Sequence, residues 1–219
     1  MIERTFDMEN AKVPRSLPNI LSVIRVLLVP VFVATLIFMR HISVWGIVVP
    51  TVVYILTALT DALDGYIARK YNLVSEFGKF IDPLADKFMV ISSQIAILAW
   101  LIMNAKTEAD AIFVYFFLFS VIIILLRELT VTGLRLAVKG NVDLAASIFG
   151  KLKTISQMVG TVIILLEPKT AFLGDVPFIT FCREYHVFSY VMLAIMVFTT
   201  IWSMIEYMKA YLPHIDFNK

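Results

Sequence analysis

The chain has 219 residues, of which 60% are apolar and 16% are charged. Ordinary soluble domains have about 45–50% apolar and about 25% charged residues. So large an apolar share excludes a soluble globule and a disordered chain, and a single cysteine excludes a disulfide framework. The formal net charge of +2 predicts no basic face for nucleic acid. The composition therefore indicates a polytopic helical membrane protein.

Six long apolar runs follow one another, each near the ~20 residues that a helix needs to cross a bilayer. They cover about residues 17–39, 44–60, 80–103, 111–126, 153–166 and 185–211. The second run continues as a polar segment to about Arg69, and the fourth continues as a helical pattern to about Val138. We therefore expect an all-α bundle of six transmembrane helices over residues 17–212. Residues 1–16 are then a cytoplasmic surface helix or solvated segment, and residues 213–219 a cytoplasmic tail.

The placement of Lys and Arg predicts the orientation of the bundle. With six spans, both termini share a side with the loops that follow the second and fourth spans. Fifteen of the 19 Lys and Arg residues fall on that side. The other side holds Arg40, Lys106, Lys169 and Arg183. We therefore expect a multi-pass protein of the cell membrane with both termini in the cytoplasm.

Four aspartates lie where the second and third predicted helices approach the cytoplasmic side. Asp61 and Asp64 are three residues apart, and Asp82 and Asp86 are four apart, so each pair shares one face of its helix. Because the loop between the two helices is short, the helices are antiparallel neighbours. Their ends therefore bring four carboxylates together.

Converging carboxylates repel one another and need cations. Lys or Arg could serve, but a set of oxygen ligands suits hard divalent ions such as Mg²⁺ or Mn²⁺. Four acids are enough for two ions about 3.5–4 Å apart, an arrangement that supports phosphoryl transfer. The sequence thus predicts a two-metal site.

Small and basic residues accompany these aspartates. Gly65, Ala68 and Gly78 leave room for a ligand against the helix backbone, although close helix packing is the alternative. Arg69 and Lys70 suit phosphate oxygens, and simple anchoring on the cytoplasmic side is the interpretation we prefer for Lys70.

The whole pattern, D-x2-D-G-x2-A-R-x8-G-x3-D-x3-D, resembles the signature of the CDP-alcohol phosphatidyltransferases. It is matched at every position, by Asp61, Asp64, Gly65, Ala68, Arg69, Gly78, Asp82 and Asp86. The resemblance implies an enzyme in which an alcohol displaces CMP from a CDP-linked lipid with the help of two divalent metal ions.

The resemblance also implies roles for individual residues. The four aspartates are the metal ligands, and Asp86 is in addition the general base that takes the proton of the acceptor hydroxyl. The cytidine nucleotide is expected against Gly65, Ala68, Arg69, Ser75 and Gly78. The opening of the first helix, with Asn19, Ser22 and Arg25, resembles the segment that borders the donor site in the family, and helix capping is an alternative role for Asn19.

The signature does not choose the acceptor alcohol, but later residues bear on it. Glu128, Thr132, Arg135 and Lys139 form one stripe of the fourth helix, and Arg127 lies beside it. Charged groups at the membrane end of a bundle usually face its interior. Lys151 and Lys153 begin the fifth helix. Arg and Lys side chains near a metal site suit a second anion, so an acceptor with its own phosphate is favoured. Snorkelling to the interface is the alternative for Lys139 and Lys151.

Two segments resemble the phosphatidylglycerophosphate synthase branch of the family: R-E-x-T-x-T-G-x-R from Arg127 to Arg135, and G-K-x-K-T-x2-Q from Gly150 to Gln157. This resemblance implies CDP-diacylglycerol as donor and sn-glycerol 3-phosphate as acceptor. The predicted acceptor-phosphate site comprises Arg127, Arg135, Lys151 and Lys153. The family further implies a homodimer in contact with membrane lipids.

Two alternatives remain open at this stage. The first keeps the chemistry and changes the acceptor to inositol phosphate, serine or phosphatidylglycerol. The second is a divalent-metal transporter, since acidic residues within spans also mark ion paths. The sequence disfavours a transporter, because its four clustered aspartates lie at the cytoplasmic ends and no acid lies at mid-bilayer to pass an ion on.

Overall fold

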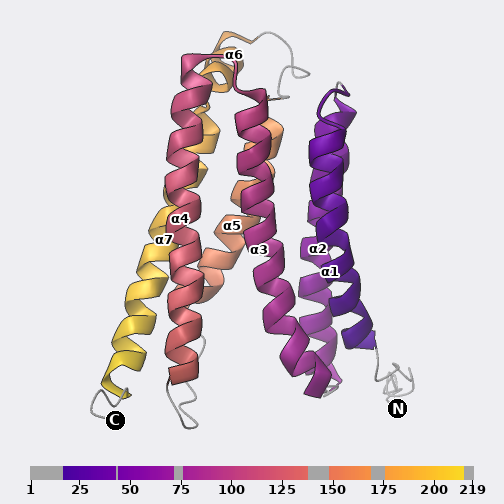
Figure 1. Cartoon of the computed structure of the whole chain (residues 1–219), viewed down its shortest axis with the longest axis vertical. Helices are drawn as coiled ribbons and strands as arrows, with labels where there is room; N and C mark the ends of the chain where they lie inside the picture. The colour runs from indigo at the N-terminus through magenta and orange to yellow at the C-terminus, as the bar shows by residue number, and fades with distance from the viewer. Residues whose placement is uncertain (1–16, 43, 72–75, 138–147, 169–175, 215–219) are drawn as a thin grey trace, which may run out of the picture.

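The computed structural model describes residues 17–42, 44–71, 76–137, 148–168 and 176–214 (Figure 1). Over these ranges all regular secondary structure is helical. The helices are α1 (Leu17–Phe38), α2 (Trp45–Lys70), α3 (Glu76–Asn104), α4 (Glu108–Ala137), α5 (Ile148–Leu166), α6 (Pro177–Glu184) and α7 (Val187–Tyr211), followed by the 3-10 helix η2 (Leu212–His214). The predicted all-α membrane bundle is confirmed.

The six predicted spans correspond to α1–α5 and α7. Five helices are long and apolar enough to cross a bilayer, over Ile20–Phe38, Lys87–Asn104, Glu108–Leu134, Ile148–Leu166 and Val187–Tyr211. The second predicted span is apolar only over Trp45–Asp61, because the last part of α2 carries the acidic and basic residues of the motif. Helix α5 begins at Ile148, earlier than the apolar run suggested.

Helix α6 was not predicted from the sequence. It has only eight residues and starts at Pro177. Tyr185 and His186 separate it from α7, and the φ of 53° at His186 lies in the left-handed region. The His186 ring is held in place by Asp110 at 2.8 Å and by a stacking contact with Phe113 at 4.8 Å between ring centroids. Glu167 completes this corner, because its carboxylate accepts the backbone N–H groups of Phe188 and Ser189 at 2.9 Å and so caps α7.

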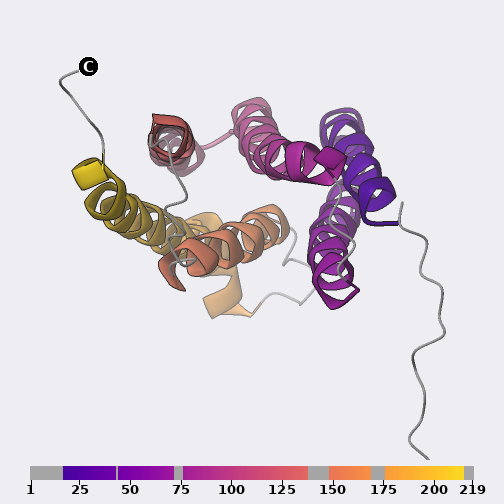
Figure 2. The same ribbon diagram turned by 90° about the horizontal axis from the view of Figure 1, so that it is seen from below.

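The bundle has two groups of helices (Figures 1 and 2). Helix α1 packs against α2 and α3, and helix α7 packs against α4 and α5. Contacts of α3 with α4 and of α2 and α3 with α5 join the groups. The first turns of α1, α3 and α5 and the last turns of α2, α4 and α7 lie at one end of the bundle, the lower end in Figure 1. The motif and the cationic segments therefore meet at that end.

Polar side chains in the interior tie the two groups together. The Tyr54 hydroxyl of α2 hydrogen-bonds with Ser93 of α3 and Thr161 of α5. The amide nitrogen of Gln94 donates to the Thr161 hydroxyl at 3.2 Å. Because lipid offers no hydrophobic drive for helix association, such bonds between helices help to set their register. Close packing does the same for α5 and α7, since a Cβ added at Gly160 would collide with the Met196 sulfur.

Candidate functional site

The interior hydrogen bonds show which residues lie at the same depth in the bundle. Helices α3 and α5 run in the same direction, and Gln94 is level with Thr161 because the two side chains are bonded. Eight residues earlier on each helix, about 12 Å toward the lower end, lie Asp86 on α3 and Lys153 on α5. The backbone positions of Asp86 and Lys153 are therefore nearly level.

The same reasoning places Asp61. Helix α2 is antiparallel to α3, and Tyr54 is level with its partner Ser93. Seven residues from each, again toward the lower end, lie Asp61 on α2 and Asp86 on α3. One layer of the bundle thus contains the predicted metal ligands Asp61 and Asp86 and the predicted acceptor residue Lys153.

Asp61 forms an ion pair across α1 and α2. Its Oδ1 lies 2.7 Å from the Arg25 Nη1, and the exposed fraction of the side chain is 1% for Arg25 and 29% for Asp61. An arginine within a span needs such a partner, since an isolated charge in the bilayer is costly. Ser22, one turn earlier on α1, is also buried. The sequence placed Arg25 and Ser22 beside the donor, and the structure adds that Arg25 contacts a predicted metal ligand.

The rest of the aspartate motif is placed by its backbone alone. Asp64, Gly65, Ala68 and Arg69 follow Asp61 on α2, Gly78, Asp82 and Asp86 lie on α3, and Asn19 lies in the first turn of α1. The side chains of these residues, and Ser75 altogether, lie outside the described part of the structure. Their metal and nucleotide contacts remain predictions.

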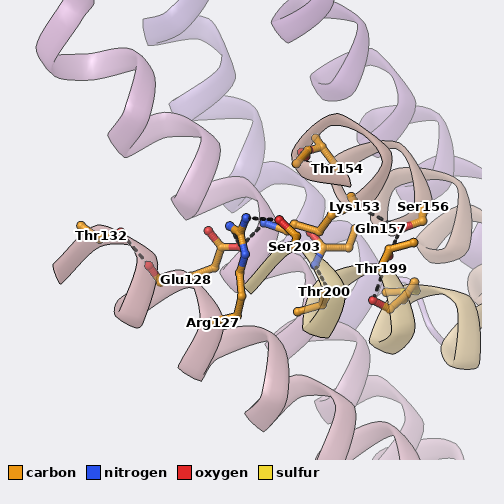
Figure 3. Close-up of polar contacts among 12 residues, drawn as sticks. Arg127, Glu128, Thr132, Lys153, Thr154, Ser156, Gln157, Thr199, Thr200 and Ser203 are labelled. Carbon is orange, nitrogen blue, oxygen red and sulfur yellow. Dashed lines mark hydrogen bonds and ion pairs between the residues drawn. The ribbon is translucent and has the colours of Figure 1, made fainter. Parts of the chain in front are cut away.

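A buried cation cluster lies in the second group of helices, α4, α5 and α7 (Figure 3). It consists of Arg127 and Glu128 of α4 and Lys153 of α5, and the exposed fraction of each side chain is 10% or less. Lys153 Nζ binds Glu128 Oε1, and Arg127 Nη1 donates to the same oxygen at 3.3 Å. Both cations thus meet at one carboxylate oxygen, so a second anion of similar size could contact both.

Helix α7 supports this cluster. Arg127 Nη2 donates to the Ser203 hydroxyl at 2.7 Å, and the guanidinium carbon lies 5.3 Å from the centre of the Tyr207 ring. A hydrogen bond and a cation–π contact together fix the direction of the guanidinium. The sequence analysis missed Ser203 and Tyr207. A polar stripe at Thr199, Ser203 and Tyr207, one residue per turn, was the available signal.

The structure separates the predicted acceptor residues. Arg127 and Lys153 lie together, whereas Lys151 is exposed and takes no part in the cluster among the described contacts. Arg135 lies two turns beyond Glu128 on α4, and its side chain is outside the described part. Thr132 of the same stripe donates to the Glu128 carbonyl at 2.6 Å.

Among the described residues the cluster has two cations and one carboxylate, so these three groups together carry one excess positive charge. In a low-dielectric layer such an excess attracts an anion more strongly than it would in water. Arg127 supplies the planar fork that binds two phosphate oxygens, and Lys153 supplies a point charge. The layer therefore joins α1–α3, which contribute Asp61 and Asp86, to a cationic region formed by α4, α5 and α7.

Comparison with known proteins identifies the family to which a chain with both the aspartate motif and the cation cluster belongs. The family model described as CDP-alcohol phosphatidyltransferase matches residues 15–202 of the chain. This match spans the aspartate motif and the cation cluster alike.

Several relatives carry the name CDP-diacylglycerol–glycerol-3-phosphate 3-phosphatidyltransferase. The protein from Bacillus subtilis is 35% identical over 176 residues, which cover 74% of this chain and 83% of the relative. That from Pseudomonas fluorescens is 31% identical over 209 residues, covering 91% and 92%. An Arabidopsis thaliana relative, whose name ends in the number 2, is 36% identical over 165 residues, covering 72% and 67%. The chain belongs to the CDP-alcohol phosphatidyltransferase family.

Proposed function

We propose that the protein transfers the phosphatidyl group from CDP-diacylglycerol to sn-glycerol 3-phosphate, giving phosphatidylglycerol phosphate and CMP. The observation that carries this acceptor is the buried pair of Arg127 and Lys153 at the depth of Asp86. The phosphate dianion of such an acceptor could bind both Arg127 and Lys153. Serine has no phosphate, so it would leave these two cations without a dianion to bind. The names of the relatives support the same acceptor.

Two divalent ions, Mg²⁺ or Mn²⁺, would be held by Asp61, Asp64, Asp82 and Asp86. Asp61 fits this role, because it is partly exposed and Arg25 contacts one of its two oxygens, so the carboxylate already faces a cation. When bound, the ions supply the positive charge that stabilises the diphosphate of the donor and the departing CMP.

The residues of the chain bind and orient the two substrates. Arg25, Arg69 and the small residues of α2 and α3 would hold the donor nucleotide, and Arg127 and Lys153 the phosphate of the acceptor, with Arg135 as a further contact. Asp86 takes the proton of the acceptor hydroxyl. A bond forms between that oxygen and the phosphatidyl phosphorus, while the bond from this phosphorus to the CMP oxygen breaks.

The lower end of the bundle in Figure 1 would face the cytoplasm, with both termini on that side of the cell membrane. The support is the excess of Lys and Arg at this end. The water-soluble substrate, sn-glycerol 3-phosphate, would then enter from the cytoplasm, and the water-soluble product, CMP, would leave to the same side. A homodimer is the expected assembly.

The acceptor assignment is tested by supplying purified protein in lipid nanodiscs with CDP-diacylglycerol, Mg²⁺ and one acceptor at a time. The acceptors are sn-glycerol 3-phosphate, inositol phosphate, serine and phosphatidylglycerol. We expect CMP release and a new phospholipid with sn-glycerol 3-phosphate, and little turnover with the others. A faster reaction with any other acceptor would overturn the assignment.

A further inference from the structure

Gln157 lies one helical turn further from the lower end of the bundle than Lys153 of the cation cluster. It follows Lys153 by four residues on α5, so its side chain is on the same face, one turn deeper in the bundle. Figure 3 shows the two side chains next to each other, between α5 and α7. The exposed fraction of Gln157 is only 1%.

The two ends of the Gln157 amide differ in their surroundings. Its nitrogen donates to the hydroxyl of the buried Thr200 at 3.3 Å, which fixes the amide against α7. Its oxygen is buried and accepts no hydrogen bond from the described part of the chain. Buried acceptors are usually satisfied, because an unmet one destabilises the fold. A hydrogen-bond donor from a bound molecule could satisfy this oxygen.

We infer that Gln157 is a specificity-determining residue that accepts a hydrogen bond from the secondary hydroxyl of the acceptor, the one that does not react. This inference rests on the proposed function. Lys153 and Arg127 hold the phosphate at the level of Asp86, and Gln157 lies about one helical turn, ~6 Å, away along α5. The three-carbon acceptor has its secondary hydroxyl between its phosphate and its reacting primary hydroxyl, so a phosphate on the cluster brings that hydroxyl near the turn that carries Gln157.

The chemistry gives this contact discriminating power. A buried group built to bind a substrate hydroxyl disfavours an analogue without it, because the protein group then stays unsatisfied. Gln157 would thus select a polyol phosphate from simple alkanol phosphates that have the same charge and the same reacting hydroxyl.

The test compares sn-glycerol 3-phosphate with 3-hydroxypropyl phosphate, which lacks only the secondary hydroxyl. In the unaltered protein we expect kcat/KM to be about tenfold to a hundredfold higher for sn-glycerol 3-phosphate. Gln157→Met keeps the length of the side chain and removes the acceptor oxygen. It should lower kcat/KM for sn-glycerol 3-phosphate by a similar factor and leave that for 3-hydroxypropyl phosphate nearly unchanged.

Gln94 on α3 provides the matched control. It is equally buried, its amide nitrogen also bonds a threonine hydroxyl, and its oxygen likewise lacks a partner in the described structure. It is level with Thr161, however, one turn deeper than Gln157. Gln94→Met should keep the preference for sn-glycerol 3-phosphate.

Two results would overturn the inference: an unaltered protein that uses both acceptors equally well, or a Gln157→Met variant that loses the same factor on both. The first needs no variant, so poor folding of Gln157→Met does not block the test, and Gln157→Leu offers a second shape. Turnover of sn-glycerol 3-phosphate without a preference would sink this inference alone. No turnover of sn-glycerol 3-phosphate by the unaltered protein would instead remove the proposed function, and with it this inference.

Discussion

The two groups of helices carry opposite charge in the same layer of the bundle. On α1–α3 this layer contains Asp61 and Asp86, and Arg25 contacts Asp61. On α4, α5 and α7 it contains Arg127 and Lys153, and the carboxylate of Glu128 contacts both. In each group a residue of opposite sign accompanies the pair. The comparison suggests that each region is prepared for ligands of the opposite charge: metal ions on one side and an anion on the other.

The largest expected loss of activity comes from variants of the aspartates on α2 and α3. Asp61→Asn or Asp86→Asn should abolish most turnover, because a neutral amide is a poor ligand for a hard divalent ion. Excess EDTA should have the same effect on the unaltered protein, and added Mg²⁺ should reverse it. CMP release from CDP-diacylglycerol is the measurement.

Asp110→Asn is the control for these variants, since Asp110 is a carboxylate at the opposite end of the bundle, bonded to His186. It should retain most of the activity. Turnover at the normal rate in EDTA would refute the metal assignment.

The next effect concerns the cationic region. Lys153→Met should raise KM for sn-glycerol 3-phosphate by about tenfold to a hundredfold, because one charge-assisted bond to phosphate is lost. KM for CDP-diacylglycerol should change little. The variant also removes the partner of Glu128, so its thermal stability is measured alongside.

Lys151→Met is the matched control, because Lys151 is exposed and lies two residues away on the same helix. We expect it to change neither constant appreciably. If Lys151→Met and Lys153→Met raised KM for the acceptor equally, a diffuse attraction by surface charge would explain the result better than a buried binding site.

A smaller change in KM is expected from a variant of α7, the helix that supports Arg127. Ser203→Ala removes the hydroxyl that receives the Arg127 hydrogen bond at 2.7 Å, so the guanidinium loses part of its orientation. KM for sn-glycerol 3-phosphate should rise by about threefold to tenfold, less than with Lys153→Met, since the charge itself remains.

Ser156→Ala tests whether this effect is specific. Ser156 bonds Thr199 at 2.8 Å between α5 and α7, as a neutral pair outside the cluster. It should alter stability without a selective change in KM for the acceptor. Equal kinetic effects of the two serine variants would show that only helix packing is involved.

The sequence predicted the parts of this architecture that depend on local pattern. The apolar runs identified α1–α5 and α7, and the fixed spacing of the motif placed Asp61 and Asp86 on consecutive antiparallel helices. Helix α6 was not predicted, because a helix of eight residues that begins at a proline is too short to show a clear helical period of apolar residues.

Contacts between distant helices could not be read from spacing. The pair of Arg25 with Asp61 depends on how α1 packs against α2, and the pair of Lys153 with Glu128 on how α4 and α5 pack against α7. The same holds for the difference between Lys151 and Lys153. Both lie in the first turns of α5, and only the packing of that helix buries one and exposes the other.

We propose that donor and acceptor are bound by different halves of one layer. Inhibition kinetics on the unaltered protein and on Lys153→Met, with CMP and inorganic phosphate as inhibitors, would test this proposal. We predict that CMP competes with CDP-diacylglycerol in both proteins. Phosphate should compete with sn-glycerol 3-phosphate in the unaltered protein and inhibit Lys153→Met much more weakly. Phosphate inhibition of equal strength in both proteins, or a parallel loss of CMP inhibition in Lys153→Met, would contradict the account.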